Sequence, residues 1–191
     1  SRAYAQELDV KELLEFAEME LFKVAEGHIK KETQKIGPLI DIAIKQIQEA
    51  GKSMDGMSGV PSGFTKLDRL TAGWQKSDLI IIAARPSMGK TAFVLSMARN
   101  MAVDLNRGVA FFSLEMSSIQ LVNRLISSET ELPSEKIRTG NLKEHEWVQL
   151  DNKIKKLINA PIYIDDTPAI SIFELRAKCR RLIKKYPNLQ C

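Results

Sequence analysis

Apolar residues recur at helical spacing in two runs near the start of the chain. The first run lies within residues 10–25 and has glutamates on its opposite side; its apolar members are Val10, Leu13, Leu14, Ala17, Leu21 and Val24. The second run follows Gly37-Pro38 and ends at Gly51; it contains Leu39, Ile40, Ala43, Ile44 and Ile47. We predict two amphipathic helices without an obvious partner in this region. Their apolar faces must pack on the rest of the chain or on another chain.

Residues 51–63 are rich in glycine and serine, a composition typical of a flexible connection. We therefore divide the chain into residues 1–35, residues 36–56, which hold the second helix and the connection, and a main domain at 57–191.

Strands and helices are expected to alternate in the main domain. The continuous apolar run at residues 79–83 predicts a strand buried on both faces. Further strands are expected at 109–113 and 161–165, and helices at 90–104, 117–129, 144–159 and 170–186. This order predicts an α/β fold with a mostly parallel sheet covered on both faces.

A possible phosphate-binding loop follows the first expected strand and reads Ala84-Arg85-Pro86-Ser87-Met88-Gly89-Lys90-Thr91. Backbone amides and a helix N-terminus at such a loop bind phosphates. Lys90 is expected to reach the β- and γ-phosphates, and the Thr91 hydroxyl to bind Mg²⁺. Gly89 should leave room for the backbone to close on the phosphates.

The loop departs from the general pattern at its first position, where Ala84 replaces glycine. A chance Gly-Lys-Thr at the start of a helix is the alternative interpretation. The expected strand before the loop and the helix after it favour a P-loop (Walker A) that binds a nucleoside triphosphate with magnesium. Its nucleotide-binding residues would be Arg85, Pro86, Ser87, Met88, Gly89, Lys90 and Thr91, with Thr91 also the metal ligand.

Carboxylates follow the second and third expected strands, at the sheet edge where ligands bind in parallel folds. Glu115 could orient and deprotonate an attacking water, or it could only favour the start of the next helix through the helix dipole. Asp165-Asp166 could be a metal-binding pair, but we favour a turn that leads into the last helix.

Composition restricts the class of protein without fixing its function. Of the chain, 44% is hydrophobic, enough for a buried core, and no segment is long and apolar enough to span a membrane. With no secretion signal, we expect a cytoplasmic protein whose two cysteines, Cys179 and Cys191, are reduced. His28 and His145 are expected at the surface.

The charge of +4 is unevenly distributed: residues 1–56 carry 8 basic and 11 acidic groups, and residues 57–191 carry 20 and 13. A basic domain is compatible with a nucleic-acid partner. In the last expected helix, Ile172, Leu175, Leu182 and Ile183 should form the buried side. We expect its basic residues to form a solvated face rather than a DNA contact; they are Arg176, Lys178, Arg180, Arg181, Lys184 and Lys185.

Several motifs of the chain resemble the bacterial replicative DNA helicase family, DnaB, and the resemblance covers essentially all of it. They are Gly59-Val60-Pro61-Ser62-Gly63-Phe64, Leu67-Asp68, Thr71-Ala72-Gly73, Ser77-Asp78-Leu79-Ile80-Ile81, residues 83–91 and Ser113-Leu114-Glu115-Met116. The family commonly has alanine at the position of Ala84. It also has a glutamate at the position of Glu115 that is regarded as its catalytic base.

The resemblance implies a RecA-like P-loop NTPase that couples ATP hydrolysis to movement on DNA. Family members form a homo-hexamer with ATP and Mg²⁺ between neighbouring subunits and single-stranded DNA in the central channel, and they meet a primase and a helicase loader. Glu115 and Lys90 would then be the catalytic residues. Residues 1–35 would end an N-terminal helical domain, and residues 36–56 would carry a linker helix that packs on the adjacent subunit.

The resemblance also suggests a RecA-like domain that is incomplete at the C-terminus. Asn188-Leu189-Gln190-Cys191 is similar to the approach to a strand that, in the family, ends in a magnesium-holding aspartate. That aspartate, the DNA-contacting loops and the arginine finger are not among residues 1–191. We therefore expect these residues alone to bind nucleotide weakly at most and to lack ATPase and unwinding activity.

Three other functions share part of this pattern. A RecA-type recombinase or clamp-like ATPase would form open filaments rather than closed hexamers. A small-molecule kinase would also have the P-loop, but its reaction does not require the two amphipathic helices predicted within residues 1–56. A docking module would self-associate without binding nucleotide.

Overall fold

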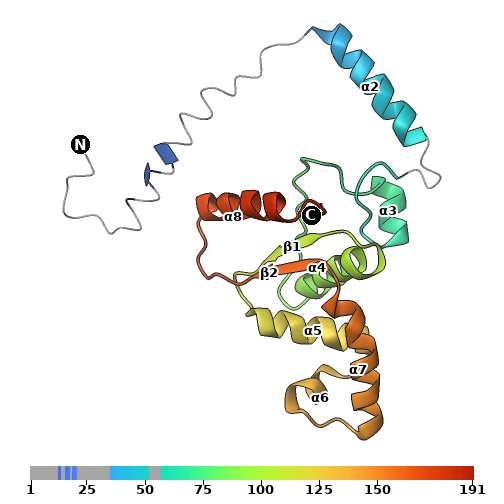
Figure 1. Cartoon of the computed structure of the whole chain (residues 1–191), viewed down its shortest axis with the longest axis vertical. Helices are drawn as coiled ribbons and strands as arrows, with labels where there is room; N and C mark the ends of the chain where they lie inside the picture. Colours follow the sequence, from blue (N-terminus) through green and yellow to red (C-terminus); the bar gives the residue numbers. More distant parts are fainter. Residues whose placement is uncertain (1–12, 14–15, 18, 21–34, 52–56) are drawn as a thin grey trace.

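The computed structural model describes residues 35–51 and 57–191, together with residues 13, 16, 17, 19 and 20 (Figure 1). Most of the helix expected at 10–25, together with His28 and most of the region 1–35, lies outside the described residues; the described residues 13, 16, 17, 19 and 20 are helical. The elements in chain order are α2 (Ile36–Gly51), α3 (Thr65–Thr71), α4 (Lys90–Arg99), the π-helical turn η2 (Asn100–Asp104), β1 (Val109–Phe112), α5 (Ser118–Thr130), α6 (Ser134–Thr139), α7 (Glu144–Ile158), β2 (Ile162–Asp165) and α8 (Ile172–Lys185).

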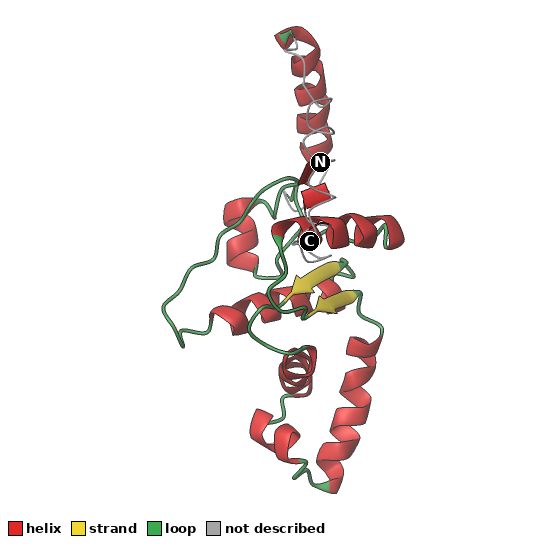
Figure 2. Cartoon of the chain, turned by 90° about the vertical axis from the view of Figure 1, so that its left-hand side faces the viewer, coloured by secondary structure: helices red, strands yellow, loops and turns green. Residues whose placement is uncertain are grey.

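A parallel sheet lies at the centre of the main domain (Figures 1 and 2). Strands β1 and β2 pair in parallel, with Val109 opposite Ile162 and Phe112 opposite Asp165. On the other side of β1, Gly108 forms a parallel bridge with Leu189, and the Ala110 amide donates to the Cys191 carbonyl at 2.7 Å. Residues 188–191 thus lie alongside β1, which has neighbours on both sides.

Alternating side chains of the sheet pack on helices at its two faces. Ile162 and Ile164 contact the fully buried Leu121 of α5 and its neighbours. From the opposite face of β2, Tyr163 stacks on Tyr186 with 3.9 Å between ring centroids, and Asp165 accepts from Lys178 of α8. The parallel sheet covered on both faces is confirmed, since strand alternation directs neighbouring residues to opposite helices.

The strand expected at residues 79–83 is wrong. Among the described residues this segment belongs to no strand, and Leu79 and Ile81 are 88% and 81% exposed. A strand exists only where a neighbour pairs with its backbone groups, and no described segment forms a ladder with residues 79–83. The apolar run is real, but the pairing that would bury it is not present among these residues.

Residues 57–74 form a compact unit that holds α4 in place. Val60 and Trp74 form an antiparallel bridge, and the buried Asp68 carboxylate accepts from the Ser62 amide and hydroxyl at 2.7 and 2.6 Å. The Trp74 indole donates to Met97 Sδ of α4, and the rings of Phe64 and Phe93 stack 5.0 Å apart. The helix that begins at Lys90 is therefore anchored to this unit at Phe93 and Met97.

The remaining predicted elements agree with the structure within a few residues. The helix expected at 90–104 consists of α4 and η2, and the strands and helices expected at 109–113, 117–129, 144–159, 161–165 and 170–186 correspond to β1, α5, α7, β2 and α8. The short helices α3 and α6 have no expected counterpart.

The predicted buried side of the last helix is partly wrong. Ile172 and Ile183 are 69% and 59% exposed, whereas Leu175 and Leu182 are half-buried. The inward stripe instead runs through Leu175, Lys178, Cys179, Leu182 and Tyr186, because Lys178 and Tyr186 make the contacts with β2. Arg180, Arg181 and Lys184 are exposed to solvent, as predicted, but Lys178 donates hydrogen bonds to Asp165 and Thr167.

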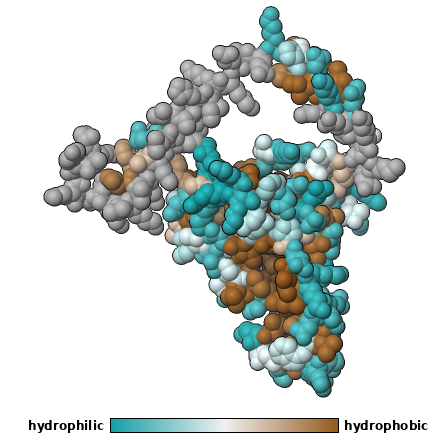
Figure 3. Space-filling model, in the orientation of Figure 1, coloured by the Kyte–Doolittle hydropathy of each residue, from teal (hydrophilic) through white to brown (hydrophobic). Residues whose placement is uncertain are grey.

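Helix α2 lies apart from the main domain in both ribbon views (Figures 1 and 2). Its large apolar side chains are exposed, with Ile40 and Ile44 at 48% and 47%, and apolar surface is visible along it (Figure 3). The second amphipathic helix is confirmed. Its apolar face packs on no element of the described main domain.

Candidate functional site

The loop before α4 turns sharply at Ser87 and Gly89. Both have positive φ values, 63° and 82°, and the Met88 amide donates to the Arg85 carbonyl at 3.2 Å. A Cβ on Gly89 would meet nothing within 4 Å. The need for glycine at this position therefore comes from its left-handed backbone rather than from crowding by a described neighbour.

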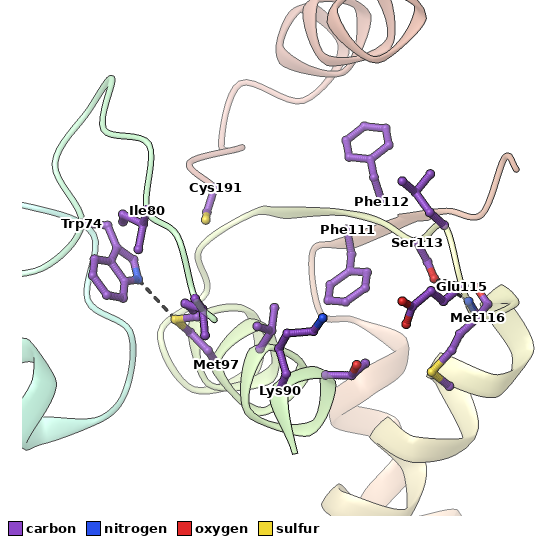
Figure 4. Close-up of a pocket in the computed structure, with 14 residues that line it drawn as sticks. Trp74, Ile80, Lys90, Met97, Phe111, Phe112, Ser113, Glu115, Met116 and Cys191 are labelled. Carbon is purple, nitrogen blue, oxygen red and sulfur yellow. Dashed lines mark hydrogen bonds between the residues drawn. The ribbon is translucent and has the colours of Figure 1, made fainter. Parts of the chain in front are cut away.

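A cavity of about 490 Å³ lies between the start of α4 and the end of β1 (Figure 4). Its polar wall consists of Lys90, Thr91, Ser113 and Glu115, and its apolar wall includes Trp74, Ile80 and Phe111. The Lys90 and Glu115 side chains, both exposed, point into this space from opposite sides (Figure 4). The structure thus brings together two of the predicted loop residues and the predicted glutamate.

The other loop residues do not share this cavity. Arg85, Pro86, Ser87, Met88 and Gly89 are exposed, and none belongs to the described lining of the cavity. They precede the first turn of α4, whose amide groups lie at a helix N-terminus suited to an anion. Their expected part in nucleotide binding stays a prediction.

Glu115 lies on a short loop, residues 113–117, that leaves the carboxyl end of β1. The Ser113 hydroxyl donates to the Met116 carbonyl at 2.7 Å and accepts from the Met116 amide at 3.1 Å, which closes the loop on itself. Ser117 then caps α5, since its hydroxyl accepts from the Gln120 amide and the Gln120 side chain accepts from the Ser117 amide. Glu115 is therefore held at the sheet edge, with its side chain facing the cavity (Figure 4).

Asp165, the last residue of β2, and Asp166 both use their carboxylates in hydrogen bonds at the connection that leads to α8. Asp165 accepts from the Thr167 amide at 3.0 Å and from Lys178 Nζ at 2.5 Å, and the Lys178 hydrogen bond lowers the pKa of its carboxyl to about 2. The Asp166 carboxylate accepts from the Ser118 amide at 2.7 Å, which lowers its pKa as well. Among the described residues, no group of three or more His, Cys, Asp or Glu side chains could hold a metal ion.

Other predicted features are placed as follows. His145 is exposed on α7, as expected. Cys179 and Cys191 are free thiols, and burial raises the pKa of both. No helix in the described part of the chain has the length and apolar character needed to cross a membrane.

Neither the loop-closing role of Ser113 nor the contact between Asp166 and Ser118 was predicted from the sequence. The signal for Ser113 is a serine at the end of a predicted strand. Serine hydroxyls commonly close such turns by accepting from a backbone amide a few residues later, here that of Met116. The Asp166 contact joins positions 48 residues apart, so no local pattern indicates it.

Residues 59–191 match the protein family described as "DnaB-like helicase C terminal domain". The chain is 45% identical to "Replicative DNA helicase DnaC" of Bacillus subtilis (strain 168) over 179 residues, and 44% identical to "Replicative DNA helicase DnaB" of Geobacillus stearothermophilus over 182 residues. Each match covers 94% of this chain but only 39% of the relative. The chain thus spans well under half the length of these curated relatives.

Two solved structures share the fold. One, described as an ATPase domain, superposes with a TM-score of 0.73 at 36% identity, covering 83% of this chain and 55% of that one. The other, "The Structure Of A DnaB-Like Replicative Helicase And Its Interactions With Primase", superposes with a TM-score of 0.69 at 34% identity, covering 90% of this chain and 40% of that one. The predicted RecA-like α/β fold is confirmed by these neighbours.

Proposed function

Because the chain belongs to the DnaB family of replicative DNA helicases, we propose that it forms part of an ATP-dependent helicase that moves on single-stranded DNA and separates the duplex. The observation that carries the proposal is the cavity that Lys90, Thr91 and Glu115 share. A cation, a hydroxyl and a carboxylate around one cavity are the side-chain groups that hydrolysis of a nucleoside triphosphate uses.

Each of the three side chains has a distinct role in this proposal. Lys90 binds the β- and γ-phosphates and stabilises the negative charge that develops during hydrolysis. Glu115, facing Lys90 across the cavity (Figure 4), orients the attacking water and accepts its proton. The loop at residues 85–89 contributes backbone amides to the phosphates.

The residues present also fit a magnesium ion bound with ATP. The Thr91 hydroxyl lines the cavity beside Lys90 and is an oxygen donor of the kind that Mg²⁺ prefers. When bound, the ion neutralises charge on the phosphate oxygens.

We propose that the complete protein works as a homo-hexamer around single-stranded DNA. The exposed apolar side of α2 supports this, because a helix with such a face needs a partner and the described main domain does not cover it. One structural neighbour is described together with its interactions with primase. We extend that partnership, and a helicase loader, to this protein, and we place its work in the bacterial cytoplasm.

The experiment that tests the function compares glutamate variants of the complete helicase that carries this sequence. Glu115→Gln should keep ATP binding while DNA-stimulated ATP hydrolysis falls by about 10²- to 10⁴-fold, the usual contribution of a general base. Lys90→Ala should lose both. Steady-state ATPase, nucleotide binding and duplex unwinding are measured side by side.

Glu131→Gln is the matched control, since it makes the same change at an exposed glutamate paired with Lys153 and outside the cavity lining. Its ATPase rate should stay at the wild-type level. Wild-type turnover in Glu115→Gln would contradict the assigned role of Glu115.

A further inference from the structure

We propose that Asp166 is a positioning residue that holds the Glu115 loop in its productive place. The inference rests on the proposed function, in which Glu115 acts on the attacking water. Asp166 does not line the cavity, so it acts through the loop and not on the nucleotide. What makes it more than a turn residue is that Asp165 and Asp166 bind opposite ends of that loop.

The first end of the loop, Ser113, is held by a backbone hydrogen bond to Asp165. The Ser113 amide donates to the Asp165 carbonyl at 2.9 Å, which continues the pairing of β1 with β2 beyond Phe112. Ser113 is buried, and its hydroxyl closes the following turn on Met116. The point at which the chain leaves the sheet is thus fixed by the residue immediately before Asp166.

The second end is bound by the Asp166 side chain. Ser118 is the first residue of α5, and its amide donates to Asp166 Oδ2 at 2.7 Å. A carboxylate at a helix N-terminus is favoured by the helix dipole, and this hydrogen bond holds the pKa of Asp166 below its usual range. Ser117 already caps α5 locally, so the Asp166 contact adds a link across the loop to β2.

Only residues 114–117 lie between these two anchors, and Glu115 is one of them. Without the carboxylate of Asp166, the far end of the loop would be linked to the sheet only through the packing of α5, and its direct hydrogen bond to the residue after β2 would be lost. A displacement of about 1 Å at a catalytic group can cost up to 10²-fold in rate. Nucleotide binding should change little, because Lys90 and Thr91 belong to α4.

The test measures ATPase kinetics of the complete helicase. Asp166→Ala should lower kcat about tenfold while the KM for ATP changes by less than about twofold. Asp166→Asn keeps a carbonyl oxygen that can accept from the Ser118 amide, so it should recover most of the rate. Ser171→Ala is the matched control: it removes a cap from α8, where Ser171 Oγ accepts from the Glu174 amide, and should leave kcat unchanged.

A double variant separates positioning from general destabilisation. If Asp166 acts through Glu115, adding Asp166→Ala to Glu115→Gln should cause no further loss of the residual rate. An additive loss would overturn the inference. So would a wild-type kcat in Asp166→Ala, or an equal loss in Ser171→Ala.

A second measurement on the 191-residue chain does not depend on turnover. Asp166→Ala should speed amide hydrogen exchange of residues 114–118 at least about tenfold relative to wild type, and Ser171→Ala should not. Unchanged exchange would overturn the inference. A wild-type helicase without ATPase activity would overturn both proposals, whereas full turnover with Asp166→Ala would overturn only this one.

Discussion

At the scale of one residue, Gly89 has a backbone conformation in the loop before α4 that favours glycine over other residues. Its φ of 82° lies in the left-handed region, where a side chain costs about 1–2 kcal/mol. Glycine there lets the chain turn directly into the first residues of α4.

Gly89→Ala should therefore lower the free energy of unfolding by about 1–2 kcal/mol. Chemical denaturation of the 191-residue chain measures it. Gly37→Ala is the control, since Gly37 lies in α2 and has neither a positive φ nor a neighbour within 4 Å of an added Cβ, and it should not lower the free energy of unfolding. Equal stability of both variants would contradict the conformational argument.

Asp165 and Lys178 form a residue pair whose contribution depends on pH. The folded pKa of Asp165 is about 2 against an ordinary value of 3.8, so the pair stabilises the fold above about pH 4 and loses this contribution as the pH falls toward 2. Both side chains are partly exposed, at 28% for Asp165 and 24% for Lys178, so solvent screening limits the gain to about 1 kcal/mol.

Lys178→Met should thus cost about 1 kcal/mol at pH 6 and almost nothing near pH 2. Urea unfolding of both proteins across this range is the measurement. A constant difference between them at all pH values would show that Lys178 acts by packing and not through the Asp165 charge.

At the scale of elements, the helices and strands that depend on local sequence were predicted, whereas features that depend on contacts between distant residues were not. Helices α5 and α7 and strand β2 were expected from the local sequence, and the structure has each of them within a few residues of the expected bounds. The strand predicted at residues 79–83 was wrong because an apolar run does not indicate whether a neighbouring strand pairs with it. Ile172 and Ile183 were mistaken because Lys178 and Tyr186, polar by sequence, make the inward contacts of α8.

The same distinction applies to the site. Lys90, Thr91 and Glu115 could be found from residue type and place relative to predicted elements, and they line one cavity. The Asp166 contact could not, because it depends on which strand lies beside β1.

Helix α5 gives the element-scale prediction. Leu121 is fully buried against Leu95 and Leu125, so Leu121→Ala should lower the free energy of unfolding by about 2–5 kcal/mol. Ile119 on the same helix is 70% exposed, and Ile119→Ala should cost less than about 0.5 kcal/mol. Equal costs for the two variants would contradict the packing of α5 on the sheet.

At the scale of the whole molecule, the main domain and α2 carry different parts of the proposed function. The main domain contains the cavity, and α2 presents apolar surface away from it (Figure 3). The proposed nucleotide site, together with an amphipathic helix whose apolar face is uncovered, suits an assembly in which neighbouring copies are joined.

Ile40→Glu with Ile44→Glu should therefore reduce the proposed hexamer of the complete protein to smaller species, because both charges would enter the proposed interface. Light scattering after size exclusion measures the mass. Lys45→Glu is the charge control on the same helix and should leave the assembly intact. An unchanged hexamer in the double variant would remove α2 from the interface.

The central claim, that Lys90 lies in a triphosphate site, is tested most directly by Mg·ATP titration of the 191-residue chain followed by backbone NMR. We predict saturable shifts at residues 87–91, with affinity at least tenfold weaker in Lys90→Ala, equivalent to about 1.4 kcal/mol. Lys76→Ala, a change at another exposed lysine, should match wild type within about twofold. Equal affinity in Lys90→Ala and wild type, or shifts confined to residues outside this loop and cavity, would contradict the account.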